Sequence, residues 1–105
     1  MAFTGNENQN ISLGEAIELT TRYRESVSPA ANLAGFFGKT ILQKILSQPG
    51  CVGIRIYHGL KKEDNSQTFV LVGADSNEKD LYNGDLAEYA TPCPPFCDLN
   101  SPLHS

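Results

Sequence analysis

The sequence predicts an α+β domain in which two N-terminal helices pack on one face of a small antiparallel sheet. Apolar residues recur at helical spacing up to about residue 48, and the period changes to two from residue 51. The segment 91–105 holds four of the six prolines. Because 105 residues suffice for one modest core, we expect a disordered tail over 1–10, a single domain over 11–90 and an extended proline-rich tail over 91–105.

The first helix is predicted between Ser12 and Val27. Ser12 followed by Glu15 matches the capping box, in which the serine hydroxyl accepts a backbone N–H and the glutamate reaches back to the cap. An apolar stripe follows at helical spacing: Leu13, Ala16, Ile17, Thr20, Tyr23 and Val27. Ser28-Pro29 ends this helix, because the residue before a proline is disfavoured in helical geometry.

The second helix is predicted from Phe36 or Phe37 to Gln48, where Pro49-Gly50 stops it. Within it, apolar side chains again form one stripe: Phe37, Ile41, Leu42, Ile45 and Leu46.

Two strands of an antiparallel hairpin are predicted next. Apolar and other residues alternate over 51–57, which is typical of a half-buried strand. The run 68–72 is apolar on both faces, which is typical of a central strand. Asn83-Gly84 is a strong turn signal and predicts a further hairpin of two short strands, 79–82 and 85–89.

The composition is that of an ordinary globular protein, with 40% hydrophobic and 19% charged residues. The longest apolar run is far shorter than the roughly 20 residues that a bilayer-spanning helix needs. The first ten residues lack the charged and apolar regions of a secretory signal. We therefore expect a cytoplasmic protein with no membrane partner, in a compartment where thiols stay reduced.

Charge is distributed unevenly along the chain. Residues 1–62 carry seven basic and four acidic groups (net +3), whereas residues 63–105 carry one basic and eight acidic groups (net −7). The basic part has few clustered Lys or Arg, which argues against nucleic acid as a partner. The acidic part favours a protein partner or a second copy with a basic face, in an association that weakens as salt rises.

Cys93 and Cys97 flank two prolines and a phenylalanine and allow three interpretations. Their thiolates could bind zinc if Cys51, His58 or His104 completed a tetrahedral set. They could form a reversible disulfide, although their spacing differs from that of thioredoxin-like motifs. They could also be buried structural thiols beside a polyproline segment. No cofactor other than zinc is indicated.

Arg55 and Tyr57 share one face of the predicted strand and His58 ends it, so these three residues form a candidate binding surface. The commoner explanation for such residues is a solvated sheet face. Gly38-Lys39-Thr40 lacks the first glycine and the preceding strand of a phosphate-binding loop. The segment from Asp75 lacks the glycine and the glutamate of a calcium loop. We find no catalytic motif, so an enzyme is not indicated.

The chain contains, in this order, the segments GFFG (35–38), GIRIY (53–57), VLVGAD (70–75) and PCPPFC (92–97). Together they resemble a group of small uncharacterised bacterial proteins. The resemblance implies a bacterial source and carries no activity, ligand or partner.

The open edges of a small sheet must be paired or covered, and this requirement predicts the function. We expect a non-enzymatic protein-interaction module, a homo-oligomer. The alternative is a small thiol-redox or zinc-binding protein that uses Cys93 and Cys97.

Overall fold

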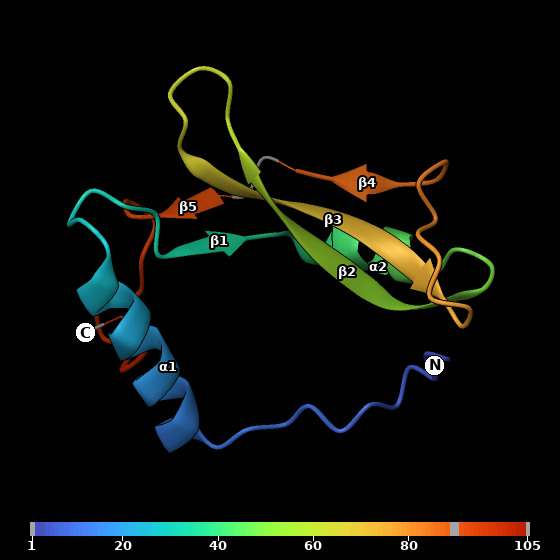
Figure 1. The fold of residues 1–105 in the computed structure, drawn as a ribbon, viewed down its shortest axis with the longest axis horizontal. Coiled ribbons are helices and arrows are strands. Elements are labelled where there is room, and N and C mark those ends of the chain that lie inside the picture. Colours follow the sequence, from blue (N-terminus) through green and yellow to red (C-terminus); the bar gives the residue numbers. More distant parts are fainter. Residues whose placement is uncertain (1, 89–90, 105) are drawn as a thin grey trace. The chain divides into compact units, whose positions relative to one another are not determined.

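The computed structural model describes residues 2–88 and 91–104 (Figure 1). Its elements run in the order α1 (Leu13–Ser26), β1 (Ala34–Phe36), α2 (Lys39–Leu46), β2 (Cys51–Leu60), β3 (Gln67–Asp75), β4 (Leu86–Ala87) and β5 (Thr91–Cys93). Two helices and antiparallel sheets confirm the α+β class. Among the described residues, no helix has the length and apolar character needed to cross a membrane.

The chain divides into two compact units. The sheet unit comprises the described residues of 1–8 and 37–90 and contains α2, β2, β3 and β4. The cysteine unit comprises the described residues of 9–36 and 91–105 and contains α1, β1 and β5. Since α1 and α2 belong to different units, the packing of both helices on one sheet face stays a prediction, as does the single domain over 11–90.

Helix α1 begins as its sequence predicts. The Ser12 hydroxyl accepts the Glu15 N–H at 3.1 Å, and the Glu15 carboxylate accepts the Ser12 N–H at 3.4 Å, which confirms the capping box. Glu18 and Arg22 form an i,i+4 ion pair at 3.2 Å on the solvent side. No residue of α1 is fully buried.

A short strand stands where the sequence suggested the start of the second helix. Ala34–Phe36 forms β1 and pairs antiparallel with β5, with Ala34 opposite Cys93 and Phe36 opposite Thr91. Helix α2 therefore begins later than predicted, at Lys39, with Gly38 as its N-cap. The partner strand lies in the segment predicted as an extended tail, so local spacing alone does not reveal this pairing.

The larger sheet has the order β2-β3-β4. Its long, twisted hairpin of β2 and β3 confirms the predicted pair of strands, with Ile56 opposite Leu71 and a bulge between Cys51 and Gly53 (Figure 1). The bulge lies at the start of β2, and the register is continuous from Gly53 to Leu60.

The predicted hairpin around Asn83-Gly84 is wrong. Asp80 instead bridges to Ala74, and Leu86–Ala87 pairs with β3 as strand β4. Both segments thus use the second edge of β3, whose backbone groups a separate hairpin would leave unpaired. The far end of the predicted strand 85–89 includes Tyr89, which lies outside the described residues.

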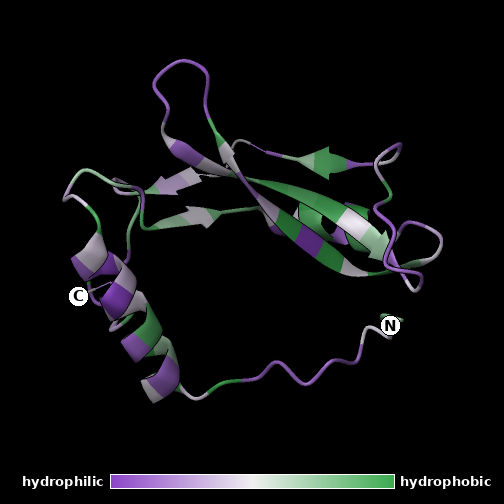
Figure 2. Cartoon of the chain, viewed as in Figure 1, coloured by the Kyte–Doolittle hydropathy of each residue, from purple (hydrophilic) through white to green (hydrophobic). Residues whose placement is uncertain are grey.

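The core of the sheet unit lies where α2 meets β3 and β4. Ile45, Leu71 and Ala87 are its buried members. Partly buried hydrophobic residues pack around them: Phe37, Ile41, Leu42, Ile54 and Phe69. Figure 2 shows the corresponding concentration of hydrophobic residues along β3 and in α2.

The Gln48 side chain links the end of α2 by hydrogen bonds to the segment that precedes β4. Its Nε2 donates to the Ile45 carbonyl at 2.8 Å, and its Oε1 accepts the Asp85 N–H at 2.9 Å. Lys44 and Asp85 add an ion pair at 3.6 Å. These contacts join the helix to the sheet by polar as well as apolar groups.

Candidate functional site

Arg55 and Tyr57 project from the same face of β2 toward Asp80. The Arg55 guanidinium donates from Nη1 to Asp80 Oδ1 at 2.5 Å and to the Glu78 carbonyl at 3.2 Å. The Tyr57 hydroxyl donates to Asp80 Oδ2 at 2.5 Å. Both oxygens of one carboxylate are therefore engaged by side chains of β2.

This cluster shifts the titration of its members. The hydrogen bond from the Tyr57 hydroxyl, with the Arg55 guanidinium beside it, lowers the pKa of Asp80 below its ordinary value. The same carboxylate raises the pKa of Tyr57, because it accepts a hydrogen bond from the protonated hydroxyl, and partial burial acts in the same direction. The hydrogen bond to Asp80 likewise raises the pKa of Arg55. All three shifts favour the charge state in which the cluster holds together.

The N-terminal segment also contacts this part of the sheet unit. The Phe3 N–H donates to the Ser76 carbonyl at 3.0 Å, and the Arg55 guanidinium carbon lies 5.3 Å from the centroid of the Phe3 ring. Gly5 has a φ of 85°, and a Cβ there would come within 2.8 Å of the Val52 carbonyl oxygen. Within the predicted disordered tail, Gly5 thus lies against the start of β2, and Phe3 lies against Arg55 and the turn that follows β3.

His58 is separated from the other two residues of the candidate binding surface. It alternates with Tyr57 along β2, and its ring lies 5.6 Å from that of Phe69, its cross-strand neighbour. The structure therefore brings Arg55 and Tyr57 together and places His58 on the opposite face. Binding by this surface stays a prediction.

Asp80 is the member of the cluster that sequence reasoning missed. It was visible only as one position of the segment that fails to match a calcium loop. At the start of that segment, the Asp75 carboxylate accepts the Asn77 and Lys79 N–H groups at 2.9 and 3.0 Å, which is a side-chain-stabilised turn. Two carboxylates of the segment are therefore occupied by the chain's own donors.

The outer edge of β2 is a second candidate surface. Over residues 2–88 and 91–104, β2 pairs with β3 alone and forms one end of the sheet. The strand is ten residues long, and Ile56, Tyr57 and Leu60 are 58%, 46% and 68% exposed. Natural edge strands are usually short or carry lysine or proline. β2 has neither residue, and its one arginine is engaged by Asp80.

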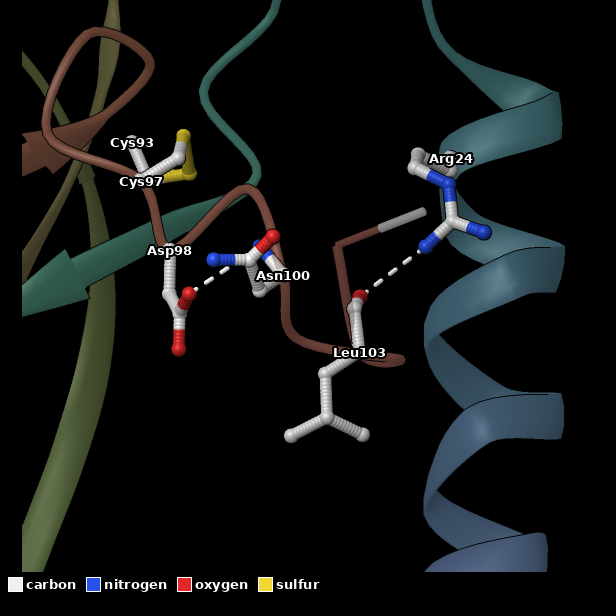
Figure 3. Close-up of a disulfide and its surroundings, with 6 residues drawn as sticks. All are labelled: Arg24, Cys93, Cys97, Asp98, Asn100 and Leu103. Carbon is white, nitrogen blue, oxygen red and sulfur yellow. Dashed lines mark hydrogen bonds between the residues drawn. A yellow bond between two sulfur atoms is a disulfide. The ribbon is translucent and has the colours of Figure 1, made fainter.

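The third candidate lies in the cysteine unit, where Cys93 and Cys97 form a disulfide (Figure 3). Cys93 ends β5, and its carbonyl accepts the Leu33 N–H at 2.6 Å. The Phe96 N–H donates to the Pro92 carbonyl at 3.0 Å, which closes the turn between the cysteines. The disulfide is thus anchored by the strand on one side and by a tight turn on the other.

A cavity of about 440 Å³ adjoins this disulfide and is lined by residues of α1, β1 and the C-terminal segment. Its walls include both cysteines and His104. The Arg24 guanidinium donates to the Leu103 carbonyl at 2.9 Å and so holds the C-terminal segment against α1 (Figure 3). One ligand-forming atom from each of Cys93, Cys97 and His104 lies within 4.8 Å of the other two.

Of the three residues predicted to complete a zinc set, the structure groups His104 with the cysteine pair. Cys51 and His58 lie in β2 of the sheet unit. The Cys51 thiol there donates to the Gly53 carbonyl at 3.2 Å.

Comparison with known proteins gives no match to a family model, a curated protein or a solved structure.

Proposed function

We propose that the protein is a non-enzymatic interaction module that associates with a second copy of itself through the edge of β2. The observation that carries the proposal is the length and composition of this edge. Gly5 lies close to this edge only at Val52, so its contact ends before the backbone of Ile54–Leu60. Exposed apolar side chains flank that stretch of backbone. Such an edge is a template for pairing with another strand.

A second copy suits this edge better than an unrelated partner. In an antiparallel pair of β2 strands related by a two-fold axis, Ile54 of one copy can lie opposite Leu60 of the other, and the two Tyr57 side chains opposite each other. Pairing over Ile54–Leu60 places Tyr57 at the axis and joins two sheets into one. The Arg55 side chains of the two copies do not repel each other as unpaired charges, because each guanidinium is hydrogen-bonded to Asp80 of its own chain.

The uneven charge of the chain supports the same partner. A net +3 over residues 1–62 and a net −7 over residues 63–105 give each copy both a basic and an acidic part. Two copies can therefore complement each other, with an association that weakens as salt rises. A pairing of seven residues is at the small end of interface sizes, so we expect a dissociation constant in the micromolar range.

The proposal keeps the cytoplasm as the place of action. Thiols are held reduced there, so the disulfide between Cys93 and Cys97 would be reversible in that compartment. Self-association through β2 does not depend on whether Cys93 and Cys97 are oxidised or reduced, since both cysteines belong to the cysteine unit.

Sedimentation velocity from low to high micromolar concentration tests the proposal. We expect a monomer–dimer equilibrium, weakened at least about tenfold by Ile56→Lys, because this introduces two like charges near the axis, a change of about 1.4 kcal/mol or more. Leu46→Lys is the matched control, since Leu46 is 48% exposed and belongs to α2, outside the paired strand. A strict monomer at high micromolar concentration, or equal effects of the two substitutions, would overturn the proposal.

A further inference from the structure

We infer that the protein in its reduced form binds a zinc ion through Cys93, Cys97 and His104, and that the disulfide is the closed form of this site. The inference concerns the cysteine unit and does not depend on self-association through β2. Its basis is a group of three side chains of the kinds that zinc prefers, gathered from two points of the C-terminal segment.

The spacing and distances fit a tetrahedral site. The cysteines are four positions apart, within the range of zinc-binding pairs. Zinc with bonds of about 2.3 Å to sulfur and about 2.0 Å to nitrogen holds its ligand atoms about 3.5–3.8 Å from one another. The ligand atoms here already lie within 4.8 Å of each other. Rotation of side chains after the disulfide opens is therefore sufficient to form the site.

His104 has an unsatisfied nitrogen in this position. Its Nδ1 is buried and has no hydrogen-bond partner among the described residues, a state that folded proteins rarely tolerate without a reason. The backbone that carries it is fixed, because the His104 N–H donates to the Ser101 carbonyl at 3.1 Å and Arg24 holds the Leu103 carbonyl. The imidazole is thus held near the sulfur atoms by contacts that do not use its ring.

The adjoining cavity supplies space for the remaining coordination position. All three proposed ligands line its wall, and its volume of about 440 Å³ exceeds that of several water molecules. A zinc ion with three protein ligands ordinarily completes its tetrahedron with water. We expect the same here, since the cavity adjoins the ligands directly.

The conversion balances with a thiol reductant. Two thiol molecules reduce the disulfide, which takes up two electrons and two protons to give the Cys93 and Cys97 thiols, while the reductant forms its own disulfide. Zinc then displaces one proton from each thiol and accepts a lone pair from neutral His104. In the reverse direction a disulfide oxidant takes up two electrons from the two thiolates and leaves as two thiols, which reforms the sulfur–sulfur bond and releases the metal.

The test is zinc titration of the full chain against a chelating dye, with and without prior reduction by a water-soluble phosphine that is itself oxidised to the phosphine oxide. We expect the reduced protein to bind one zinc per chain and the oxidised protein to bind at least about a hundredfold more weakly, because both thiolates are lost. Cobalt in place of zinc should give a thiolate-to-metal charge-transfer band in the reduced protein only.

Matched variants separate this site from other cysteines and histidines. Cys97→Ser and His104→Asn should each weaken zinc binding at least about tenfold, since even outer-shell changes have effects of that size. Cys51→Ser and His58→Asn make the same chemical changes in the sheet unit and should leave the affinity for zinc unchanged. Circular dichroism of each variant identifies any that fails to fold, and His104→Asn keeps both cysteines.

Three results would overturn the inference. Zinc binding that is equal in the oxidised and reduced proteins would remove the role of the thiolates. Unchanged affinity in folded His104→Asn would remove the role of the imidazole. The absence of stoichiometric zinc binding by the reduced wild type would remove the site altogether.

Discussion

Gly84 lies against the amide of Gln48, and replacing it with alanine should break the polar link between α2 and β4. A Cβ at position 84 would overlap Gln48 Oε1 and lie 3.1 Å from its Cδ. The amide cannot simply turn aside, because it donates to Ile45 and accepts from Asp85 at 2.8 and 2.9 Å. With each hydrogen bond contributing about 0.5–1.5 kcal/mol, Gly84→Ala should lower the free energy of unfolding by about 1–3 kcal/mol.

A double-mutant cycle isolates this contact. Gln48→Ala should by itself remove the same two hydrogen bonds and cost a similar amount of stability, about 1–3 kcal/mol. Once the amide is absent, Gly84→Ala meets no obstacle from that side chain, so the double variant should be about as stable as Gln48→Ala alone. The assay is urea unfolding followed by circular dichroism, at a protein concentration low enough to keep the chain monomeric.

Gly53→Ala provides the control. A Cβ at Gly53 has no neighbour within 4 Å, so this substitution should be neutral or slightly stabilising through the unfolded state. Additive effects of Gln48→Ala and Gly84→Ala on the free energy of unfolding would show that Gly84 does not act through the Gln48 amide. So would a loss of stability in Gly84→Ala no larger than in Gly53→Ala.

Three further outcomes are expected. Ile45→Ala should lower the free energy of unfolding by about 2–5 kcal/mol in urea, because Ile45 is fully buried. Leu46→Ala, at the exposed neighbouring position, should lower it by under about 1 kcal/mol. Equal losses would contradict the proposed core. Ser12→Ala should reduce helix stability by about 0.5–2 kcal/mol through loss of the capping box, measured by helical circular dichroism, and an unchanged signal would argue against that cap. The pKa of Asp80 is lowered in the fold, so its contribution to the free energy of unfolding is present above its unfolded pKa of about 3.9 and is lost as pH falls through its lower folded pKa. Wild type should therefore lose more stability than Asp80→Asn on acidification in urea unfolding. Parallel plots of stability against pH for the two proteins would count against the Tyr57 and Arg55 contacts.

The elements predicted correctly from the sequence are those whose causes are local. The capping box at Ser12 needs only Glu15, three positions away, and it is present. The hairpin of β2 and β3 follows from a change of period and an intervening polar loop, and both strands are present and pair antiparallel as expected. In each case the residues that form the contact are also those whose pattern in the sequence predicts it.

The elements that were missed have partners distant in the chain. β1 becomes a strand because β5 pairs with it, and the three residues Ala34–Phe36 carry no strand pattern of their own. Asn83-Gly84 is a strong turn signal, yet the free edge of β3 takes up the flanking segments in place of a local hairpin. Local turn chemistry was outweighed by backbone groups that needed partners.

The candidate sites show the same division. Alternation along β2 correctly places Arg55 and Tyr57 on one face, since side chains two residues apart point the same way. Their common partner, Asp80, comes from a segment beyond β3 and could be found only once the chain had folded. The grouping of His104 with the cysteine pair likewise depends on the turns that follow Cys97.

Amide hydrogen exchange along β2, measured as a function of protein concentration, tests self-association through this edge most directly. We expect the N–H groups of Ile54–Leu60 that point away from β3 to become protected as protein concentration rises, while exchange in the loop 61–66 stays the same. Exchange along β2 that does not change across the micromolar range would contradict self-association through this edge.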